Sequence, residues 1–286
     1  MEINDNNIHG FVKDYIENQG IGLPNFLQGK HINNWDVSKV TNMNELFSHY
    51  FNFNEPLNNW DVSNVTTMSK IFRVCTRFNQ PLNNWDVSKV EDMNLMFSEC
   101  TNFNQPLNNW DVSNVKDMEG MFATCRNFNK SLNNWNVSNV ETMEAMFYEC
   151  ISFNQPLNNW DVSNVETMES MFQDCTNFNQ PLNNWDVSKV SNMYRMFRNC
   201  TRFNQNLSRW NISNVEGDIE LIFVGSLINE QNKPRLVPDQ LGGRRKKYLK
   251  SMRRKSTKIG KKKSNRKTKR KTRKNKSKKL VNKKRK

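Results

Sequence analysis

One stretch of the sequence decides the fold, because the chain repeats it with small changes. It occupies residues 153–175 and reads Phe-Asn-Gln-Pro-Leu-Asn-Asn-Trp-Asp-Val-Ser-Asn-Val-Glu-Thr-Met-Glu-Ser-Met-Phe-Gln-Asp-Cys. The tryptophans all fall at one point of a 25-residue cycle, at Trp35, Trp60, Trp85, Trp110, Trp135, Trp160, Trp185 and Trp210. Self-similarity at a fixed period is typical of solenoid proteins, whose repeats bury apolar side chains only against their neighbours.

The spacing of the apolar residues changes within each unit. Trp60 and Val62 lie two residues apart, which is the spacing along one face of an extended strand. From Val65 to Cys75 the spacing becomes that of one face of a short helix. Ser63 precedes this segment as an N-cap, and four units have a glutamate at capping-box distance, in the pairs Ser88/Glu91, Ser138/Glu141, Ser163/Glu166 and Ser213/Glu216. We therefore predict an α/β fold, a solenoid of about eight coils, each a strand, a turn, a short helix and a return loop, with the strands on a concave face.

Segments outside the repeats differ in composition. In residues 1–30 one helical face carries apolar side chains, which predicts a helix that caps the first coil, namely Ile8, Phe11, Val12, Tyr15 and Ile16. Residues 31–228 form the predicted repeat domain. Residues 229–243 contain prolines and paired glycines and are interpreted as a linker.

Residues 244–286 are strongly basic. They hold 26 Lys and Arg and no Asp or Glu, whereas the rest of the chain holds 17 Lys and Arg against 28 Asp and Glu. Such a segment has too few apolar residues to fold alone, so we expect a disordered tail. Its composition suits contact with phosphates without reading of bases. The residues expected to make these contacts are Arg244, Arg245, Lys246, Lys247, Arg253, Arg254, Lys261, Lys262, Lys263, Lys269, Arg270 and Lys271. The same composition also suits a nuclear or nucleolar address, an anionic membrane surface, or solubility alone.

Polar residues that recur with the period are the other candidates. An aspartate stripe follows the tryptophans on the predicted concave face, at Asp36, Asp61, Asp86, Asp111, Asp161 and Asp186. Stacked carboxylates repel one another unless a cation or a hydrogen-bond donor intervenes, so the stripe either binds a cationic ligand or calcium, or accepts hydrogen bonds from nearby turn amides. Recurring asparagines, such as Asn79 and Asn104, are predicted to hydrogen-bond from coil to coil.

Six cysteines also follow the period, which favours small buried core residues over a disulfide framework. They lie at Cys75, Cys100, Cys125, Cys150, Cys175 and Cys200. The sequence has no Cys-x-x-Cys motif, no zinc-ligand spacing of histidines and no nucleophile with a base partner. We therefore expect no cofactor, no metal and no enzymatic activity.

The start of the unit, Leu-x-x-Trp-x-Val, resembles the Leu-x-x-Leu-x-Leu start of a leucine-rich repeat. The whole unit, over about residues 31–225, is similar to the 25-residue repeat of BspA-type leucine-rich-repeat surface proteins, which also occurs in mycoplasma lipoproteins. Val65 stands where common leucine-rich repeats carry Asn, so their internal asparagine ladder does not transfer to that position. The resemblance implies surface display and adhesion. The basic tail resembles in composition those of giant-DNA-virus repeat proteins, which implies a viral source.

The sequence favours a repeat scaffold that binds a protein partner, with a tail that contacts nucleic acid or another polyanion. The alternatives are a surface-displayed adhesin of the BspA type and a packaging protein whose repeats space the tail. The N-terminus is acidic and lacks the apolar run of a signal peptide, and no stretch is apolar enough for a membrane span. We therefore expect an intracellular protein, nuclear or virion-associated if the source is viral.

Overall fold

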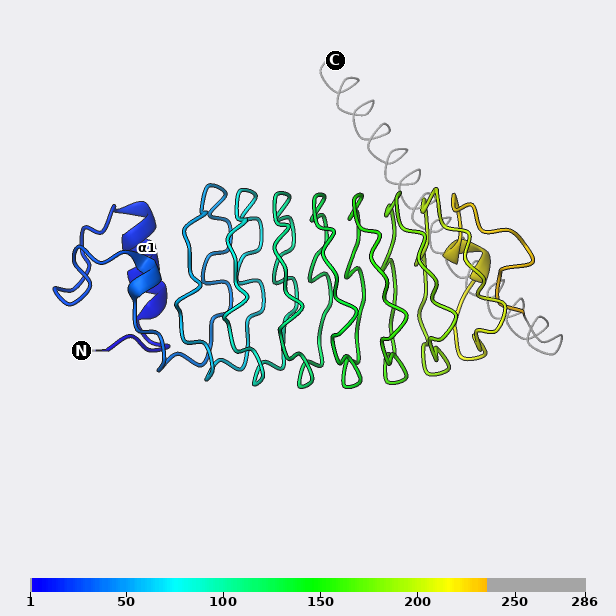
Figure 1. Ribbon diagram of the computed structural model, residues 1–286, viewed down its shortest axis with the longest axis horizontal. Helices are drawn as coiled ribbons and strands as arrows, with labels where there is room; N and C mark the ends of the chain where they lie inside the picture. The colour runs from blue at the N-terminus through cyan, green and yellow to red at the C-terminus, as the bar shows by residue number, and fades with distance from the viewer. Residues whose placement is uncertain (1, 236–286) are drawn as a thin grey trace, which may run out of the picture. The chain divides into compact units, whose positions relative to one another are not determined.

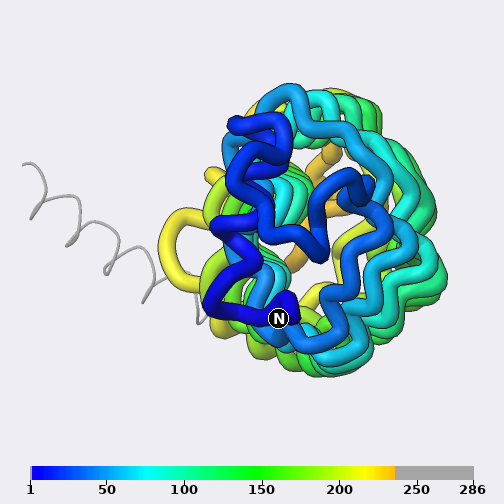
Figure 2. Tube along the Cα trace, turned by 90° about the vertical axis from the view of Figure 1, so that its left-hand side faces the viewer, coloured from blue at the N-terminus to red at the C-terminus, as the bar shows by residue number. Residues whose placement is uncertain are grey.

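The computed structural model describes residues 2–235; residue 1 and residues 236–286 lie outside the description. The helices of the described part are α1 (Ile8–Glu17) and the 3-10 helices η1 (Ile32–Asn34) and η2 (Ile219–Ile222). Most of the remaining chain forms 25-residue circuits that lie side by side, with α1 beside the first of them (Figure 1). Along the stack the circuits share nearly one outline (Figure 2). We call each circuit a coil and number them by tryptophan, so that coil 1 (residues 26–50) contains Trp35 and coil 8 (residues 201–225) contains Trp210.

Identical side chains stack from coil to coil in the core. The tryptophan rings of coils 3–8 are parallel, with centroids 6.3–6.5 Å apart and planes within 5°. Trp135 thus lies between Trp110 and Trp160, as the period predicts. Two ladders of phenylalanine rings run beside them, with centroid spacings of 5.4–5.8 Å and 5.9–6.0 Å. Because the Trp and Phe rings stack mainly between coils, a single coil could not bury them.

The prediction of an α/β fold is wrong. Residues 2–235 contain no strand, and parallel pairing between coils is limited to single bridges at Asn42, Thr67, Asp92, Asp117, Thr142, Thr167 and Asn192. The predicted strand cannot form around the tryptophan, because its amides are used inside the coil. In coil 2 the Trp60 amide donates to the Leu57 carbonyl at 3.1 Å, and the Val65 amide donates to Val62 at 2.9 Å. Each bond closes a tight turn.

The segment predicted as a helix is a run of β-turns. In coil 2 the Ile71 amide donates to the Met68 carbonyl at 3.2 Å, and the Cys75 amide donates to Phe72 at 2.9 Å. Each bond reaches three residues back, whereas an α-helix requires four. Successive turns return apolar side chains to the same inner side of the coil every three or four residues, so their spacing imitates that of a helix.

Other amides of these turns join the coils. Lys70 and Val74 donate to carbonyls of coil 3 at 2.8 Å each. Both have a positive φ, 57° and 64°, which the third residue of a type II turn requires. The same two positions have a positive φ throughout coils 1–7, and Gly120 is the one glycine among them. The turn geometry therefore directs half of the amides along the stack axis instead of along a helix.

The N-terminal segment completes coil 1. The predicted helix is confirmed as α1, which buries Ile8 and Val12. Tyr15 packs edge-on against Trp35, with ring centroids 5.5 Å apart. In each interior coil, the residue that follows the second valine after the tryptophan donates its amide hydrogen to the preceding coil. Coil 1 has no preceding coil, and there Asp5 Oδ1 accepts the equivalent bond from the Thr41 amide at 2.7 Å.

One buried donor at this end has no partner among residues 2–235. Each later tryptophan donates its indole Nε1–H to a Leu or Ile carbonyl of the preceding coil at 2.8–3.0 Å. The Nε1 of Trp35 is buried and forms no hydrogen bond within residues 2–235.

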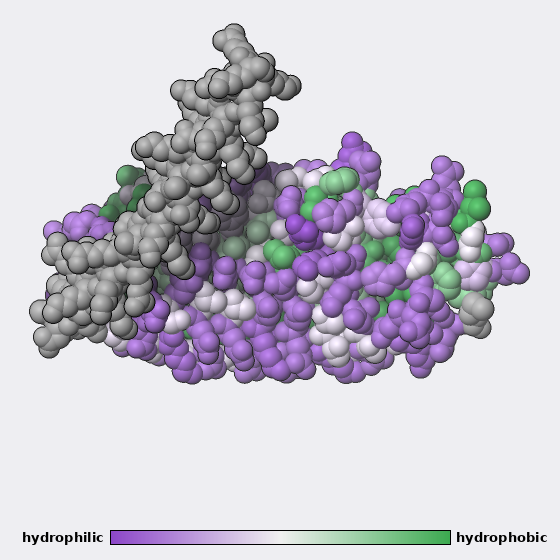
Figure 3. Space-filling model, turned by 180° about the vertical axis from the view of Figure 1, so that it is seen from behind, coloured by the Kyte–Doolittle hydropathy of each residue, from purple (hydrophilic) through white to green (hydrophobic). Residues whose placement is uncertain are grey.

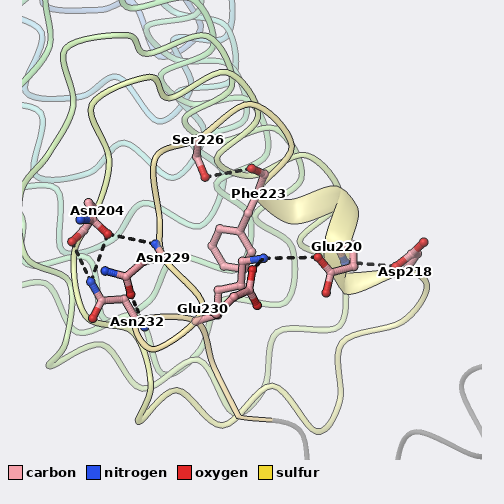
Figure 4. A network of polar contacts seen from close by, with 9 residues as sticks. Asn204, Asp218, Glu220, Phe223, Ser226, Asn229, Glu230 and Asn232 are labelled. Atoms are coloured by element: carbon pink, nitrogen blue, oxygen red, sulfur yellow. Dashed lines mark hydrogen bonds and ion pairs between the residues drawn. The ribbon is translucent and has the colours of Figure 1, made fainter.

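The last coil is less regular. Asn229 and Asn232 both hydrogen-bond to Asn204 of coil 8, at 3.0 Å from its Oδ1 to the Asn229 amide and 3.0 Å from its carbonyl to Asn232 Nδ2 (Figure 4). The Asp218 side chain accepts from the Glu220 amide at 3.1 Å and caps η2. Contacts with coil 8 therefore continue past residue 228.

Candidate functional site

The aspartate stripe lies on exposed turns. In all six coils, aspartate Oδ1 accepts a hydrogen bond from the amide of the serine two residues later, at 3.0–3.1 Å. Asn136 and Asn211 make the same bond at 3.2 and 3.1 Å. The side chain thus closes a turn with its own backbone. This is the turn-amide role that the sequence offered as the alternative to a cation site, and the serine predicted as a helix N-cap is the donor in it.

Hydrogen bonding favours the charged form of three aspartates of the stripe. The pKa of Asp36, Asp86 and Asp186 is lowered, first by the serine hydroxyl and then by the serine amide. Burial opposes this weakly, because the carboxylates are exposed. Among residues 2–235 no three His, Cys, Asp or Glu side chains are grouped so that they could hold a metal ion. Binding of a cationic ligand by the exposed side of the stripe stays a prediction.

The asparagine ladder is structural, as predicted. Asn79 Oδ1 accepts from the Asn104 amide of the next coil at 2.9 Å, and equivalent bonds of 2.9–3.0 Å recur along the stack. The prediction for the cysteines is also confirmed: all six are free and buried. Their Sγ atoms donate to carbonyls of the preceding coil at 2.8–2.9 Å. Burial raises the pKa of the Cys75 thiol to about 12.

A second set of carboxylates was missed by the sequence reasoning. It lies at the bridges between coils 3 and 6, and we call it the acidic row: Asp92, Asp117, Glu119, Glu144 and Glu169. All five are half-buried. Residues 76–175, which span these coils, contain 14 Asp and Glu against 5 Lys and Arg. The 25-residue period reveals only positions that stay constant, whereas the positions of the acidic row change from coil to coil. This variation was the signal that could have identified them.

The acidic row is held in register by backbone and amide donors. Asp117 Oδ1 accepts from the Glu119 amide at 2.8 Å, and Glu169 Oε2 accepts from Asn192 Nδ2 of the next coil at 2.7 Å. Burial is the first cause of the raised pKa of Asp117, Glu119 and Glu144, and neighbouring carboxylates add to it. Like charges are thus placed close together and partly out of water, which is unfavourable for the folded state.

Hydrophilic residues cover most of the face seen in Figure 3. None of the helices in residues 2–235 has the length and apolarity that crossing a bilayer requires. The predicted polyanion contacts, from Arg244 to Lys271, lie outside the described residues.

One family model matches the chain at two places. The family model described as "Mycoplasma protein of unknown function, DUF285" matches residues 22–135 and again residues 116–234. No curated protein and no solved structure matches the chain. The two matches overlap and together cover most of the chain, including all eight coils. The protein therefore belongs to the repeat family described as "Mycoplasma protein of unknown function, DUF285".

Proposed function

We propose that this protein is a non-enzymatic repeat scaffold that binds a protein partner through its coils and a polyanion through residues 244–286. One observation carries the first part: an almost constant frame presents different side chains in each coil. The position of Glu119, for example, holds Asn44, Ser69, Asn94, Glu119, Glu144, Glu169 and Tyr194 in coils 1–7. The core side chains of the same coils hardly change. Stacked repeats of this kind offer an extended surface and no unique pocket.

Two surfaces compete as the site for the protein partner, and matched variants separate them. The first combines Asp117→Asn, Glu119→Gln and Glu144→Gln in the acidic row. The second combines Asp86→Asn, Asp111→Asn and Asp161→Asn in the aspartate stripe. Both remove three negative charges from the middle coils. Proximity labelling with each variant should show a partner lost in one and kept in the other; a labelling profile unchanged in both would contradict binding through either surface.

The charge of residues 244–286 supports the polyanion contact. The 26 Lys and Arg follow a chain that is otherwise acidic, so charge is concentrated in one segment. Affinity for random-sequence duplex DNA should fall steeply with salt, with a slope of about −0.9 per neutralised phosphate. The chain ending at residue 243 should not bind. A control that changes Lys39, Lys89 and Lys189 of the coils to Gln should bind like the unchanged protein. Retained binding by residues 1–243 would refute the proposal.

The same basic segment favours a place inside the cell, in the nucleus or the virion if the source is viral. The alternative, a surface-displayed adhesin of the BspA type, is favoured by the resemblance of the repeat unit to that family. The position of a tagged full-length chain in its host cell decides between the two.

A further inference from the structure

The acidic row stands out because none of its carboxylates forms an ion pair with a basic side chain within residues 2–235. Glu119 lies near Asp117 of its own coil, and Glu144 lies between Glu119 and Glu169 of the flanking coils. Among the described residues, Lys70 favours the charged form of Glu119. The Lys70 ammonium is itself 3.1 Å from Glu45 Oε1.

Neutral side chains also face the row. Asn94 donates its side chain to Asp117, and Asn192 donates to Glu169. Thr67 Oγ1 lies 3.5 Å from Asp92 Oδ2. None of these groups titrates between pH 4 and pH 7, so the carboxylates are the part of this cluster that changes charge in that range.

We propose that the acidic row makes the middle of the coil stack acid-responsive, so that coils 3–6 become more stable when these carboxylates take up protons. The geometry gives the reason. Each coil is fixed against the next by backbone hydrogen bonds and ring ladders, so the backbone positions that carry the carboxylates cannot move apart. Protonation removes the repulsion and leaves groups that can still donate and accept hydrogen bonds.

The sign follows from the raised pKa of Asp117, Glu119 and Glu144. A carboxyl group with a higher pKa in the folded state binds more protons there than in the unfolded chain, so stability falls as pH rises through the folded pKa. The gain is complete below the ordinary values, 3.8 for Asp and 4.5 for Glu. Asp86 of the aspartate stripe has the opposite sign, because its lowered pKa removes stability only below 3.8. The two effects therefore occupy separate pH ranges.

The chain itself supplies the variants for a test. Asn occupies the position of Asp117 in coils 1 and 7, at Asn42 and Asn192, and amides occupy the position of Glu119 at Asn44 and Asn94. The acidic-row variant is therefore Asp117→Asn with Glu119→Gln and Glu144→Gln, in the full chain. The control is the stripe variant, Asp86→Asn with Asp111→Asn and Asp161→Asn, because Asn136 and Asn211 already occupy that position. Both carry the same change in charge.

The experiment measures Tm at pH 7, 6, 5 and 4.5 at constant ionic strength. The unchanged protein should gain about 3 °C or more between pH 7 and pH 4.5. The acidic-row variant should have a higher Tm at pH 7 and lose most of the rise, whereas the stripe variant should keep it. His9, His31 and His49 are present in all three proteins, so any contribution from them cancels in the comparison.

Three results would overturn the proposal. An equal rise in the acidic-row variant would assign the response to other groups. Loss of the rise in both variants would assign it to net charge. A 13C titration of the Glu and Asp carboxyl carbons, compared between the unchanged protein and the variant, should show that the resonances lost are those that titrate above the ordinary range; resonances that titrate normally would refute the assignment.

Discussion

The tryptophan ladder permits a measurement of one hydrogen bond by comparing the interior of the stack with its end. Trp135 donates its indole N–H to the Leu107 carbonyl at 2.9 Å, both groups being buried. Trp35 is equally buried, but its N–H has no acceptor within residues 2–235. Substitution by Phe removes the donor at either site and loses a similar part of the ring. The difference between the two variants therefore reports the bond.

The magnitude follows from the state of each donor. Trp135→Phe breaks a buried bond and leaves a carbonyl unsatisfied, which costs about 1–3 kcal/mol beyond the loss of ring contacts. Trp35→Phe removes a donor that was already unsatisfied, which returns a similar amount. We expect Trp135→Phe to be less stable than Trp35→Phe by about 2 kcal/mol or more. Trp110→Phe should behave like Trp135→Phe, since its N–H donates to Leu82 at 3.0 Å.

The assay is equilibrium unfolding in urea, followed by the fluorescence of the seven remaining tryptophans and by circular dichroism. The coils contact mainly their neighbours, so the transition should be fitted with a nearest-neighbour model as well as a two-state model. Equal free energies of unfolding for Trp35→Phe and Trp135→Phe would refute the reasoning, because ring volume alone would then account for both.

Two further predictions concern the turns and the thiols. Thr124 is β-branched and has a φ of 61°, whereas the equivalent Asn199 is a residue that tolerates this region, so Thr124→Asn should stabilise the protein by about 1 kcal/mol; Thr142→Asn, at a position without positive φ, should be close to neutral in the same urea assay. Cys125 is buried and its pKa is raised well above the ordinary range by burial, so a thiol reagent at pH 8 should label it slowly in the native protein and quickly in denaturant. Fast native labelling would contradict the core position of the cysteines.

The core could be predicted from the sequence, because stacking repeats every contact at the period of 25 residues. Trp, Phe, Leu, Val, Met and Cys positions recur together, and all of them are buried. The local backbone could not be predicted in the same way. The usual sequence signal of a type II turn is glycine at its third residue, but these positions hold residues such as Glu45, Lys70 and Arg195. Without that signal, apolar spacing of three and four residues indicates a helix.

The candidate sites were predictable to different degrees for a related reason. The aspartate stripe is constant, so the period reveals it, and the Asp-x-Ser spacing of Asp61 and Ser63 contains the turn that the structure shows. The acidic row is irregular in sequence, with Thr142 and Thr167 beside Glu144 and Glu169. Its members become neighbours only when the coils are placed in register by the bridges.

A stacked repeat places equivalent carboxylates of successive coils near one another, and the two sets of carboxylates differ in the repulsion that results. Asp86 bonds its own turn and faces water, so repeating it in other coils adds little repulsion. Glu144 differs, because the stack places Glu119 in the coil before it and Glu169 in the coil after it. A compact domain could relieve an unfavourable charge by moving one loop. Here the neighbouring coils on both sides fix the backbone that carries the charge. The charge at the variable positions therefore affects the stability of the coils that carry it. A partner that neutralises the row would stabilise the stack as protons do.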